Sequence, residues 1–293
     1  MHERLGLIGV GNMGRTIAEN FLRNGFPLTI FARKNHVKKE MIALGAEIAT
    51  SPAKLATCSD IIFLVVTDSN AVKELLFEQN GIVKGAAKGT IVVDMTTSDP
   101  QFSVRFAKRL SKTGIEYLDA PMAGGILGAQ DGQLLLMVGG KREIFERCTH
   151  VFKPIIKRAI YMGGAGSGHL MKLIHNHLAH STFLATCEAV ILGEEFGLST
   201  DTMIEVFNQG NARSYSTEIR FPKFILSKTY NMGATFSIVY KDISIVRRLG
   251  NRAGLRLPIN NCTYYYWKYA VDKGEGEEDW SKIILKMKDL LSR

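Results

Sequence analysis

A glycine-rich loop near the start of the chain constrains the fold more than any other feature. Its three glycines follow an apolar stretch at residues 5–10 and open a segment of helical periodicity at residues 16–24. In that setting the first glycine permits a tight turn, the second lets the backbone approach a pyrophosphate, and the third lets helix and strand pack closely. The helix N-terminus also favours the phosphate charge. The loop therefore predicts a dinucleotide site, with the candidate residues Gly9, Gly11, Asn12, Met13 and Gly14.

The first half of the chain alternates short apolar runs with helical stretches. This alternation predicts an α/β fold, an N-terminal Rossmann domain with a doubly wound parallel sheet covered by helices on both faces. The runs expected to be strands are residues 5–10, 28–31, 61–66, 90–94, 116–120 and 134–138.

The pattern changes after Tyr161, where four glycines within six residues punctuate the chain. Beyond them strand alternation stops, and residues 169–197 fit one long helix that we expect to bridge two domains. Further helices are expected at residues 203–207, 237–253 and 280–291. We therefore expect a dinucleotide-binding domain at residues 1–163 and an all-α C-terminal domain, for substrate binding and oligomerisation, at residues 164–293.

The end of the second expected strand bears on the choice of cofactor. An NAD site normally has an acidic residue there to accept hydrogen bonds from the ribose hydroxyls. This chain has Arg33 and Lys34 instead, and two cations would neutralise a 2′-phosphate. The pair favours NADP, with NAD as a possible second cofactor. The alternative interpretation is a solvated basic loop.

Charge and cysteine usage exclude several classes of protein. The formal net charge is +9, but the basic residues are dispersed, which argues against nucleic-acid binding. No apolar run reaches the roughly 20 residues of a spanning helix, so no membrane partner is expected. No targeting peptide is expected, because the first expected strand begins within a few residues of Met1. Four scattered cysteines suggest neither a zinc site nor a disulfide framework, which fits a cytoplasmic protein.

Two polar residues near the start of the long helix form a candidate chemical site. Lys172 and Asn176 are four residues apart, so they share one helix face just after the glycine-rich hinge. We expect this face to meet a small-molecule cleft between the domains. A carbonyl that accepts hydride gains negative charge on oxygen, and an ammonium group can stabilise that charge and deliver a proton. Histidines crowd the same helix without a metal-binding pattern, so no metal is expected.

The chain resembles the β-hydroxyacid dehydrogenase family, which includes 3-hydroxyisobutyrate dehydrogenase, tartronate semialdehyde reductase and succinic semialdehyde reductases. The resemblance spans nearly the whole chain, and five motifs carry it in the family's order. They are residues 6–14 (GLIGVGNMG), 94–97 (DMTT), 119–125 (DAPMAGG), 168–176 (GHLMKLIHN) and 241–242 (KD).

The resemblance implies a role for each matching residue. Lys172 would be the general acid in reduction and the base in oxidation, while Asn176 would bind the substrate. Gly124 and Gly125 would present N–H groups to a substrate anion beside Ala123, where most members have a serine. The implied cofactor contacts are Val65, Val66 (where a proline is common), Asn70, Thr97 and Lys241, with Asp242 orienting Lys241 or serving as an ordinary ion-pair partner.

The function that follows is an NADP-dependent interconversion of a small anionic aldehyde and its hydroxyacid. Two alternatives remain, an imine reductase of the same superfamily and a non-enzymatic cofactor-binding module, and Lys172 argues against both. The decarboxylating 6-phosphogluconate dehydrogenases have a second domain longer than the roughly 130 residues left here. A local alternative for Thr96 and Thr97 is helix N-capping before Pro100. The resemblance also implies a homodimer or homotetramer.

Overall fold

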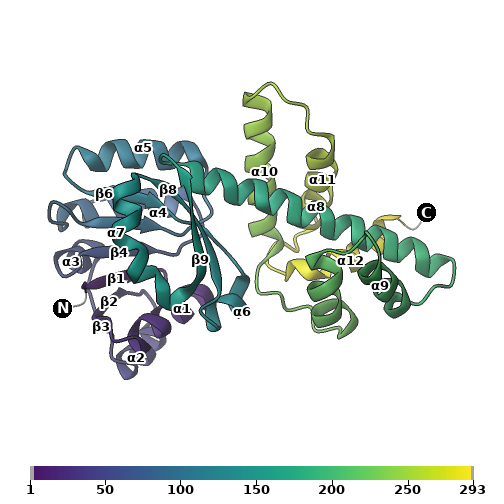
Figure 1. Ribbon diagram of the computed structural model, residues 1–293, viewed down its shortest axis with the longest axis horizontal. Coiled ribbons are helices and arrows are strands. Elements are labelled where there is room, and N and C mark those ends of the chain that lie inside the picture. Colours follow the sequence, from purple (N-terminus) through teal and green to yellow (C-terminus); the bar gives the residue numbers. More distant parts are fainter. Residues whose placement is uncertain (1–2, 292–293) are drawn as a thin grey trace. The chain divides into compact units, whose positions relative to one another are not determined.

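A computed structural model describes residues 3–291 of the chain, which divides into two compact units (Figure 1). Unit 1 extends to Lys172 and unit 2 begins at Leu173, so the division lies inside one helix, α8 (Ser167–Glu195). Unit 1 is α/β and unit 2 is helical, which confirms the expected fold class.

Within residues 3–291 the strands of unit 1 form a nine-stranded sheet of order β3-β2-β1-β4-β5-β6-β8-β7, with β9 paired to β8. The strands from β3 to β6 are parallel, and the order reverses between β1 and β4. Ligands of such sheets bind beyond the carboxyl ends of the strands at this reversal. The strand bounds are β1 (Leu5–Ile8), β2 (Leu28–Phe31), β3 (Glu47–Ile48), β4 (Ile61–Leu64), β5 (Ile91–Asp94), β6 (Glu116–Asp119), β7 (Met122–Ala123), β8 (Leu134–Gly140) and β9 (Ile156–Gly163).

The sheet is not entirely parallel, which corrects the sequence-based expectation. Strand β8 runs antiparallel to both β6 and β7, whereas β9 is parallel to β8. The strands β3, β7 and β9 were not predicted. Two of them contain only two residues, which is too short for period-2 alternation to be recognised. The third, β9, is partly exposed along its length and carries charged side chains.

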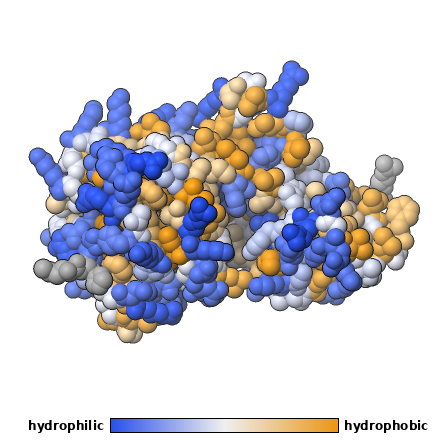
Figure 2. Space-filling view, in the orientation of Figure 1, coloured by the Kyte–Doolittle hydropathy of each residue, from blue (hydrophilic) through white to orange (hydrophobic). Residues whose placement is uncertain are grey.

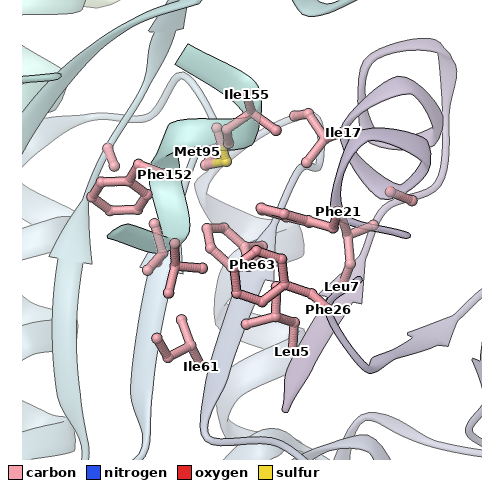
Figure 3. Close-up of a cluster of buried hydrophobic side chains, with 14 of the residues drawn as sticks. Leu5, Leu7, Ile17, Phe21, Phe26, Ile61, Phe63, Met95, Phe152 and Ile155 are labelled. Atoms are coloured by element: carbon pink, nitrogen blue, oxygen red, sulfur yellow. The ribbon is translucent and has the colours of Figure 1, made fainter. Parts of the chain in front are cut away.

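The sheet buries a hydrophobic core on each face, because successive side chains of a strand point to opposite sides. Leu7 and Phe63 belong to one core and their neighbours Ile8 and Leu64 to the other. Phe21 of α1 packs at a ring-centroid distance of 4.9 Å from Phe63, on the face drawn in Figure 3. The strands are thus apolar on both sides, as a sheet covered by helices requires.

Helices of unit 1 cover both faces. Residues of α1, α2, α6 and α7 join the first core, and residues of α3, α4 and α5 join the second. The bounds are α1 (Asn12–Arg23), α2 (Asn35–Ala43), α3 (Pro52–Thr57), α4 (Ser69–Phe77), α5 (Pro100–Ser111), α6 (Gly125–Gln130) and α7 (Arg142–Phe152), with short 3-10 turns at Ile82–Lys84 and Lys153–Ile155.

The N-cap of α5 is Asp99, whose side chain accepts a hydrogen bond of 3.0 Å from the Gln101 N–H. Pro100 occupies the first turn, where its missing N–H is tolerated. The alternative that Thr96 and Thr97 cap this helix is therefore wrong, and both threonines lie in the loop between β5 and α5.

Unit 2 is built around the remainder of α8 and an aromatic core. Trp267, Trp280, Phe183 and Phe221 are buried in this core, together with aliphatic residues of the other helices. Its elements are α9 (Thr200–Gln209), the π-helix η3 (Ser216–Leu226), α10 (Phe236–Arg252), α11 (Pro258–Asp272), the 3-10 turn η4 (Trp280–Lys282) and α12 (Ile283–Leu291).

The surface combines charged and apolar residues. Some large apolar side chains are exposed, among them Leu255, Ile259 and Tyr265, and hydrophobic surface is visible over the α10–α11 hairpin at the top of Figure 2. Among residues 3–291, none of the helices is long and apolar enough to cross a bilayer. The same residues contain no cluster of three or more acidic, histidine or cysteine side chains suited to a metal ion.

Candidate functional site

The glycine loop between β1 and α1 has a backbone that only glycine can adopt. Gly9 has φ +101°, and a Cβ there would lie 2.0 Å from the Val65 carbonyl oxygen. A Cβ on Gly14 would lie 1.9 Å from the Gly9 carbonyl oxygen. Both glycines therefore let the loop, α1 and the end of β4 approach closely.

Gly11 differs from these two glycines, since a Cβ built on it would meet no atom within 4 Å. Its place on the loop thus borders open space, as expected where a backbone must meet a ligand. Gly11 caps α1 without a side-chain hydrogen bond, and the first turn contains no acidic residue. The N–H groups that begin with Asn12 and Met13 form a positive helix end. This geometry fits a dinucleotide pyrophosphate.

Arg33 and Lys34 follow β2, and both are exposed. Neither forms an ion pair with a carboxylate anywhere in residues 3–291. Lys34 is also the N-cap residue of α2, so its position coincides with a second positive helix end. Two unneutralised cations at a helix N-terminus can hold a phosphate.

The ends of β4 and β5 are linked by hydrogen bonds. The Val66 N–H donates to Thr96 Oγ1 at 3.3 Å, and the Thr96 N–H donates to Asp94 Oδ1 at 3.0 Å. The Tyr117 hydroxyl donates to the other Asp94 oxygen at 2.7 Å, and burial raises the pKa of Tyr117 well above its usual value. This network fixes the loops that contain Val65, Val66 and Thr97.

Asn70 lies in the first turn of α4 and is exposed. Its backbone N–H donates to Asp68 Oδ1 at 2.9 Å, which leaves the side-chain amide outside that cap. The family resemblance grouped Asn70 with Val65 and Val66, which lie in the loop between β4 and α4, and Asn70 lies just beyond that loop, inside α4.

The turn from β7 into α6 exposes backbone. Gly124 has φ +125° and Gly125 has φ +63°, conformations that L side chains rarely adopt. A Cβ on Gly125 would meet nothing within 4 Å, and both glycines are exposed, so the turn borders open space. Ala123, at the end of β7, offers only a methyl group where a serine would add a hydroxyl donor.

The start of α8 is anchored by Asp119, at the carboxyl end of β6. Its two oxygens accept the N–H groups of Gly166 at 2.7 Å and His169 at 2.9 Å. Burial raises the pKa of Asp119, and the His169 charge and the two N–H donors oppose that shift. A Cβ on Gly168 would lie 2.3 Å from the Met137 carbonyl oxygen, so α8 begins in contact with the sheet.

The anchor of α8 extends to α5. His169 is fully buried, and its Nδ1 lies 2.6 Å from the Ser103 hydroxyl. Sequence reasoning considered His169 only as a metal ligand and did not single out Ser103 or assign Asp119 a role. The position of Asp119, the last residue of a buried strand, was the signal available for it. Lys172 follows one turn after His169 and is half-buried.

In unit 2, Asp242 joins two of the predicted residues. The Asn176 Nδ2 amide donates to Asp242 Oδ2 at 2.7 Å, and Lys241 Nζ lies 3.4 Å from Asp242 Oδ1. The Asn176 Oδ1 atom lies 3.2 Å from His175 Nδ1. Asp242 is 3% exposed, so its carboxylate is held by α8 and α10 together. Asp242 contacts both Asn176 and Lys241. The two roles considered for it, orienting Lys241 or serving as an ordinary ion-pair partner, do not include the hydrogen bond with Asn176.

Comparisons with known proteins agree with this geometry. Residues 4–164 match a family profile described as the NAD binding domain of 6-phosphogluconate dehydrogenase. Residues 166–287 match one described as NAD-binding of NADP-dependent 3-hydroxyisobutyrate dehydrogenase. The chain is 31% identical to 2-(hydroxymethyl)glutarate dehydrogenase of Eubacterium barkeri, over 96% of this chain and 93% of the relative. It is also 31% identical to 2-hydroxy-3-oxopropionate reductase of Escherichia coli, over 96% of both chains.

Solved structures show the same fold. The structure of Mycobacterium tuberculosis 3-hydroxyisobutyrate dehydrogenase with L-serine has a TM-score of 0.89 at 21% identity, and covers 98% of this chain and 100% of that one. An imine reductase from Myxococcus stipitatus is more distant, with a TM-score of 0.68 at 18% identity and coverage of 98% and 99%. The chain therefore belongs to the β-hydroxyacid dehydrogenase family of NAD(P)-dependent enzymes.

Proposed function

We propose that this enzyme reduces a small acid semialdehyde to its hydroxyacid, and catalyses the reverse oxidation, with NADP(H) as the preferred cofactor and Lys172 as the proton donor. Family membership supports the class of reaction, NAD(P)-dependent hydroxyacid dehydrogenase or semialdehyde reductase. The relatives named above act on a hydroxymethyl dicarboxylate and on a three-carbon oxo acid, so the substrate class is small, oxygenated and anionic.

The observation that carries the proposal is the pairing of an open glycine loop with Lys172 near the anchored start of α8. No atom lies within 4 Å of the position that a Cβ on Gly11 would take, which supports the approach of a pyrophosphate to this backbone. Asp119 fixes the helix that carries Lys172 by accepting two backbone N–H groups. A lysine held near the anchored start of a helix is suited to general acid catalysis.

The exposed pair after β2 supports the preference for NADP. Arg33 can meet two phosphate oxygens with its fork of N–H donors, and Lys34 adds a second charge at the start of α2. A carboxylate there would instead repel a 2′-phosphate.

In this reaction Lys172 transfers the proton. When bound, the cofactor supplies a hydride to the carbonyl carbon of the substrate. The Lys172 ammonium stabilises the negative charge that develops on the carbonyl oxygen. As the π electrons of the C=O bond move to that oxygen, the ammonium transfers one proton to it, and an O–H bond forms. In the oxidation direction the neutral amine removes the same proton.

The remaining residues bind and orient the reactants. The peptide N–H groups at Gly124 and Gly125 bind an anionic group close to the reacting carbonyl, such as the carboxylate of glyoxylate, and Ala123 adds no hydroxyl donor there. The Asn176 amide has two N–H hydrogens, and one of them donates to Asp242. The other hydrogen donates to the substrate. Lys241, held beside Asp242, contacts the cofactor.

The test is NADPH consumption by the purified enzyme with glyoxylate and with succinic, tartronic and methylmalonic semialdehydes, with NADH measured in parallel. We expect turnover of at least one aldehyde.

Lys172→Ala should lower kcat by orders of magnitude while NADPH binding stays near normal. Arg33→Ala should raise the KM for NADPH far more than the KM for NADH. An active Lys172→Ala variant, or equal effects on both cofactors, would reject the respective assignment.

Two other functions make different predictions in the same assay. An imine reductase would consume NADPH with cyclic imines and leave the aldehydes untouched. A cofactor-binding interaction module would bind NADPH without turning over either class. The presence of Lys172 near the anchored start of α8 favours reduction of an aldehyde.

A further inference from the structure

Unit 2 contains a cation whose charge no carboxylate balances. The guanidinium group of Arg220, on η3, packs against three aromatic rings, those of Trp280 at 5.1 Å, Tyr215 at 5.3 Å and Phe183 at 5.9 Å from its central carbon. Phe183 is fully buried and Trp280 is 6% exposed, so much of the group's surroundings is apolar.

The polar contacts of Arg220 are all neutral. Its Nη1 donates to the Ala179 carbonyl oxygen at 3.0 Å and lies 3.5 Å from the Ser216 hydroxyl, the limit of a hydrogen bond. Across residues 3–291 no Asp or Glu forms an ion pair with it. Burial lowers its pKa to about 10, and the opposing influences come from Tyr215 and Cys187 rather than from a carboxylate.

A buried charge without a counter-charge is costly, because desolvation is not repaid by attraction to an opposite charge. Structural arginines of this kind are normally paired with carboxylates. Arg220 as a whole is only half-buried, so part of the residue is exposed to solvent, and Tyr215, whose ring lies beside the guanidinium, is 58% exposed. Its planar fork suits a carboxylate.

The position of Arg220 along α8 relates it to the candidate substrate residues. Ala179, its hydrogen-bond acceptor, is three residues after Asn176, and Phe183 is seven residues after it. Residues three, four and seven apart share one helix face. Three residues correspond to an advance of about 4.5 Å along the helix axis.

We propose that Arg220 binds a carboxylate of the substrate that is remote from the reacting carbonyl. This inference rests on the proposed function and specifies its substrate class. An acid semialdehyde with two or more carbons between its aldehyde and its carboxylate spans the advance from Asn176 to Ala179, whereas the carboxylate of glyoxylate is bonded directly to the aldehyde carbon. Arg220 therefore selects longer acid semialdehydes, including those with a second carboxylate.

A binding experiment tests the site without turnover. Glutarate is titrated into the enzyme while tryptophan emission is recorded, because Trp280 lies against the guanidinium; glutaramide serves as the neutral analogue. We expect a saturable change with glutarate alone. Arg220→Gln, which keeps a donor for Ala179, should weaken glutarate binding by about tenfold or more. Arg220→Lys should weaken it less, and decides the question if the Gln variant does not fold.

Arg213→Gln is the matched control, since Arg213 is exposed nearby and lies 3.6 Å from Glu218. It should bind glutarate like the wild type. In steady-state assays Arg220→Gln should raise the KM for succinic semialdehyde by about tenfold or more and leave the KM for glyoxylate nearly unchanged.

The outcomes separate this inference from the proposed function. Wild-type affinity for glutarate in both Arg220 variants overturns the site, even if aldehydes are reduced. Glutarate binding that depends on Arg220, without turnover of any aldehyde, supports the carboxylate site and rejects the proposed reaction. Equal KM increases for glyoxylate and succinic semialdehyde overturn the selection of longer substrates.

Discussion

Single residues of the nucleotide loop have separable roles in stability and binding. A Cβ on Gly9 or Gly14 would collide with backbone, so these glycines are required by the fold itself. Gly11 has an ordinary φ of −86° and open space around its Cβ position, so the fold does not require a glycine there. We expect the approach of a ligand to require it instead.

Gly11→Ala is therefore expected to leave the free energy of unfolding within about 0.5 kcal/mol of the wild-type value. The same substitution should weaken NADPH binding by about tenfold or more, because the new methyl group occupies the space that the pyrophosphate needs. Urea unfolding and NADPH fluorescence titration measure the two quantities. Unchanged NADPH affinity would mean that the pyrophosphate lies elsewhere.

A second residue-scale prediction concerns Asp242, which contacts both Asn176 and Lys241. Asp242→Asn removes the negative charge that lies 3.4 Å from Lys241 Nζ, although it keeps one acceptor for the Asn176 amide. We expect kcat/KM to fall by about 10- to 100-fold, the effect of losing one or two charge-assisted hydrogen bonds. Glu218→Gln, which breaks the exposed pair with Arg213, is the control and should leave kcat/KM unchanged. Similar losses in both variants would contradict a specific role for Asp242.

At the scale of elements, the junction between the sheet and α8 determines where Lys172 lies. Gly168 has no room for a side chain, since its Cβ would lie 2.3 Å from the Met137 carbonyl oxygen and 2.5 Å from that of Asp119. Gly168→Ala should destabilise the protein by about 1–3 kcal/mol, as overpacking does, and lower kcat by displacing α8. Gly164→Ala, at a position with nothing within 4 Å, is the matched control. Equal unfolding midpoints for Gly168→Ala and Gly164→Ala would contradict the close contact of Gly168 with the sheet.

The pH dependence of stability tests the same junction through Asp119. Burial raises its pKa from the ordinary 3.8, so the folded state holds its proton at pH values where the unfolded chain has lost it. Stability must then fall as the pH rises from 3.8 through the raised value. Since asparagine does not titrate, the stability of the wild type relative to Asp119→Asn should decrease over that window. Urea unfolding at several pH values measures it, and an increase with pH would mean that the two N–H donors outweigh burial.

How far the sequence predicts each element depends on the length of its pattern. The strands from β1 to β6 that have four residues were predicted. The strands β1, β2, β4 and β5 read as apolar runs with nearly every residue buried, whereas β6 has an acidic residue at each end. The reversed direction of β8 was not predictable, since an apolar run carries no information about its partner. Glycine and lysine motifs indicated the candidate site. Tertiary partners such as Ser103 for His169 were not visible, because 66 residues separate them.

At the scale of the whole molecule, the two units have separate hydrophobic cores, and each unit contains one fully buried cysteine. Cys148 belongs to a core of unit 1 and Cys187 to the core of unit 2. Burial raises the pKa of Cys148 to about 12 and that of Cys187 well above its usual value, so neither forms a reactive thiolate near neutral pH. Cys58 and Cys262 are exposed, one in each unit. The four thiols therefore report on the two units separately.

We expect only Cys58 and Cys262 to react with a thiol reagent under native conditions. In the variant that combines Cys58→Ser and Cys262→Ser, labelling should require unfolding, and peptide mass resolves Cys148 from Cys187. Because the nucleotide loop belongs to unit 1, saturating NADPH should raise the urea midpoint for labelling of Cys148, by mass action on the state that binds it. The Gly11→Ala variant in the same background should lose that shift. A shift confined to Cys187 would contradict the placement of the cofactor on unit 1.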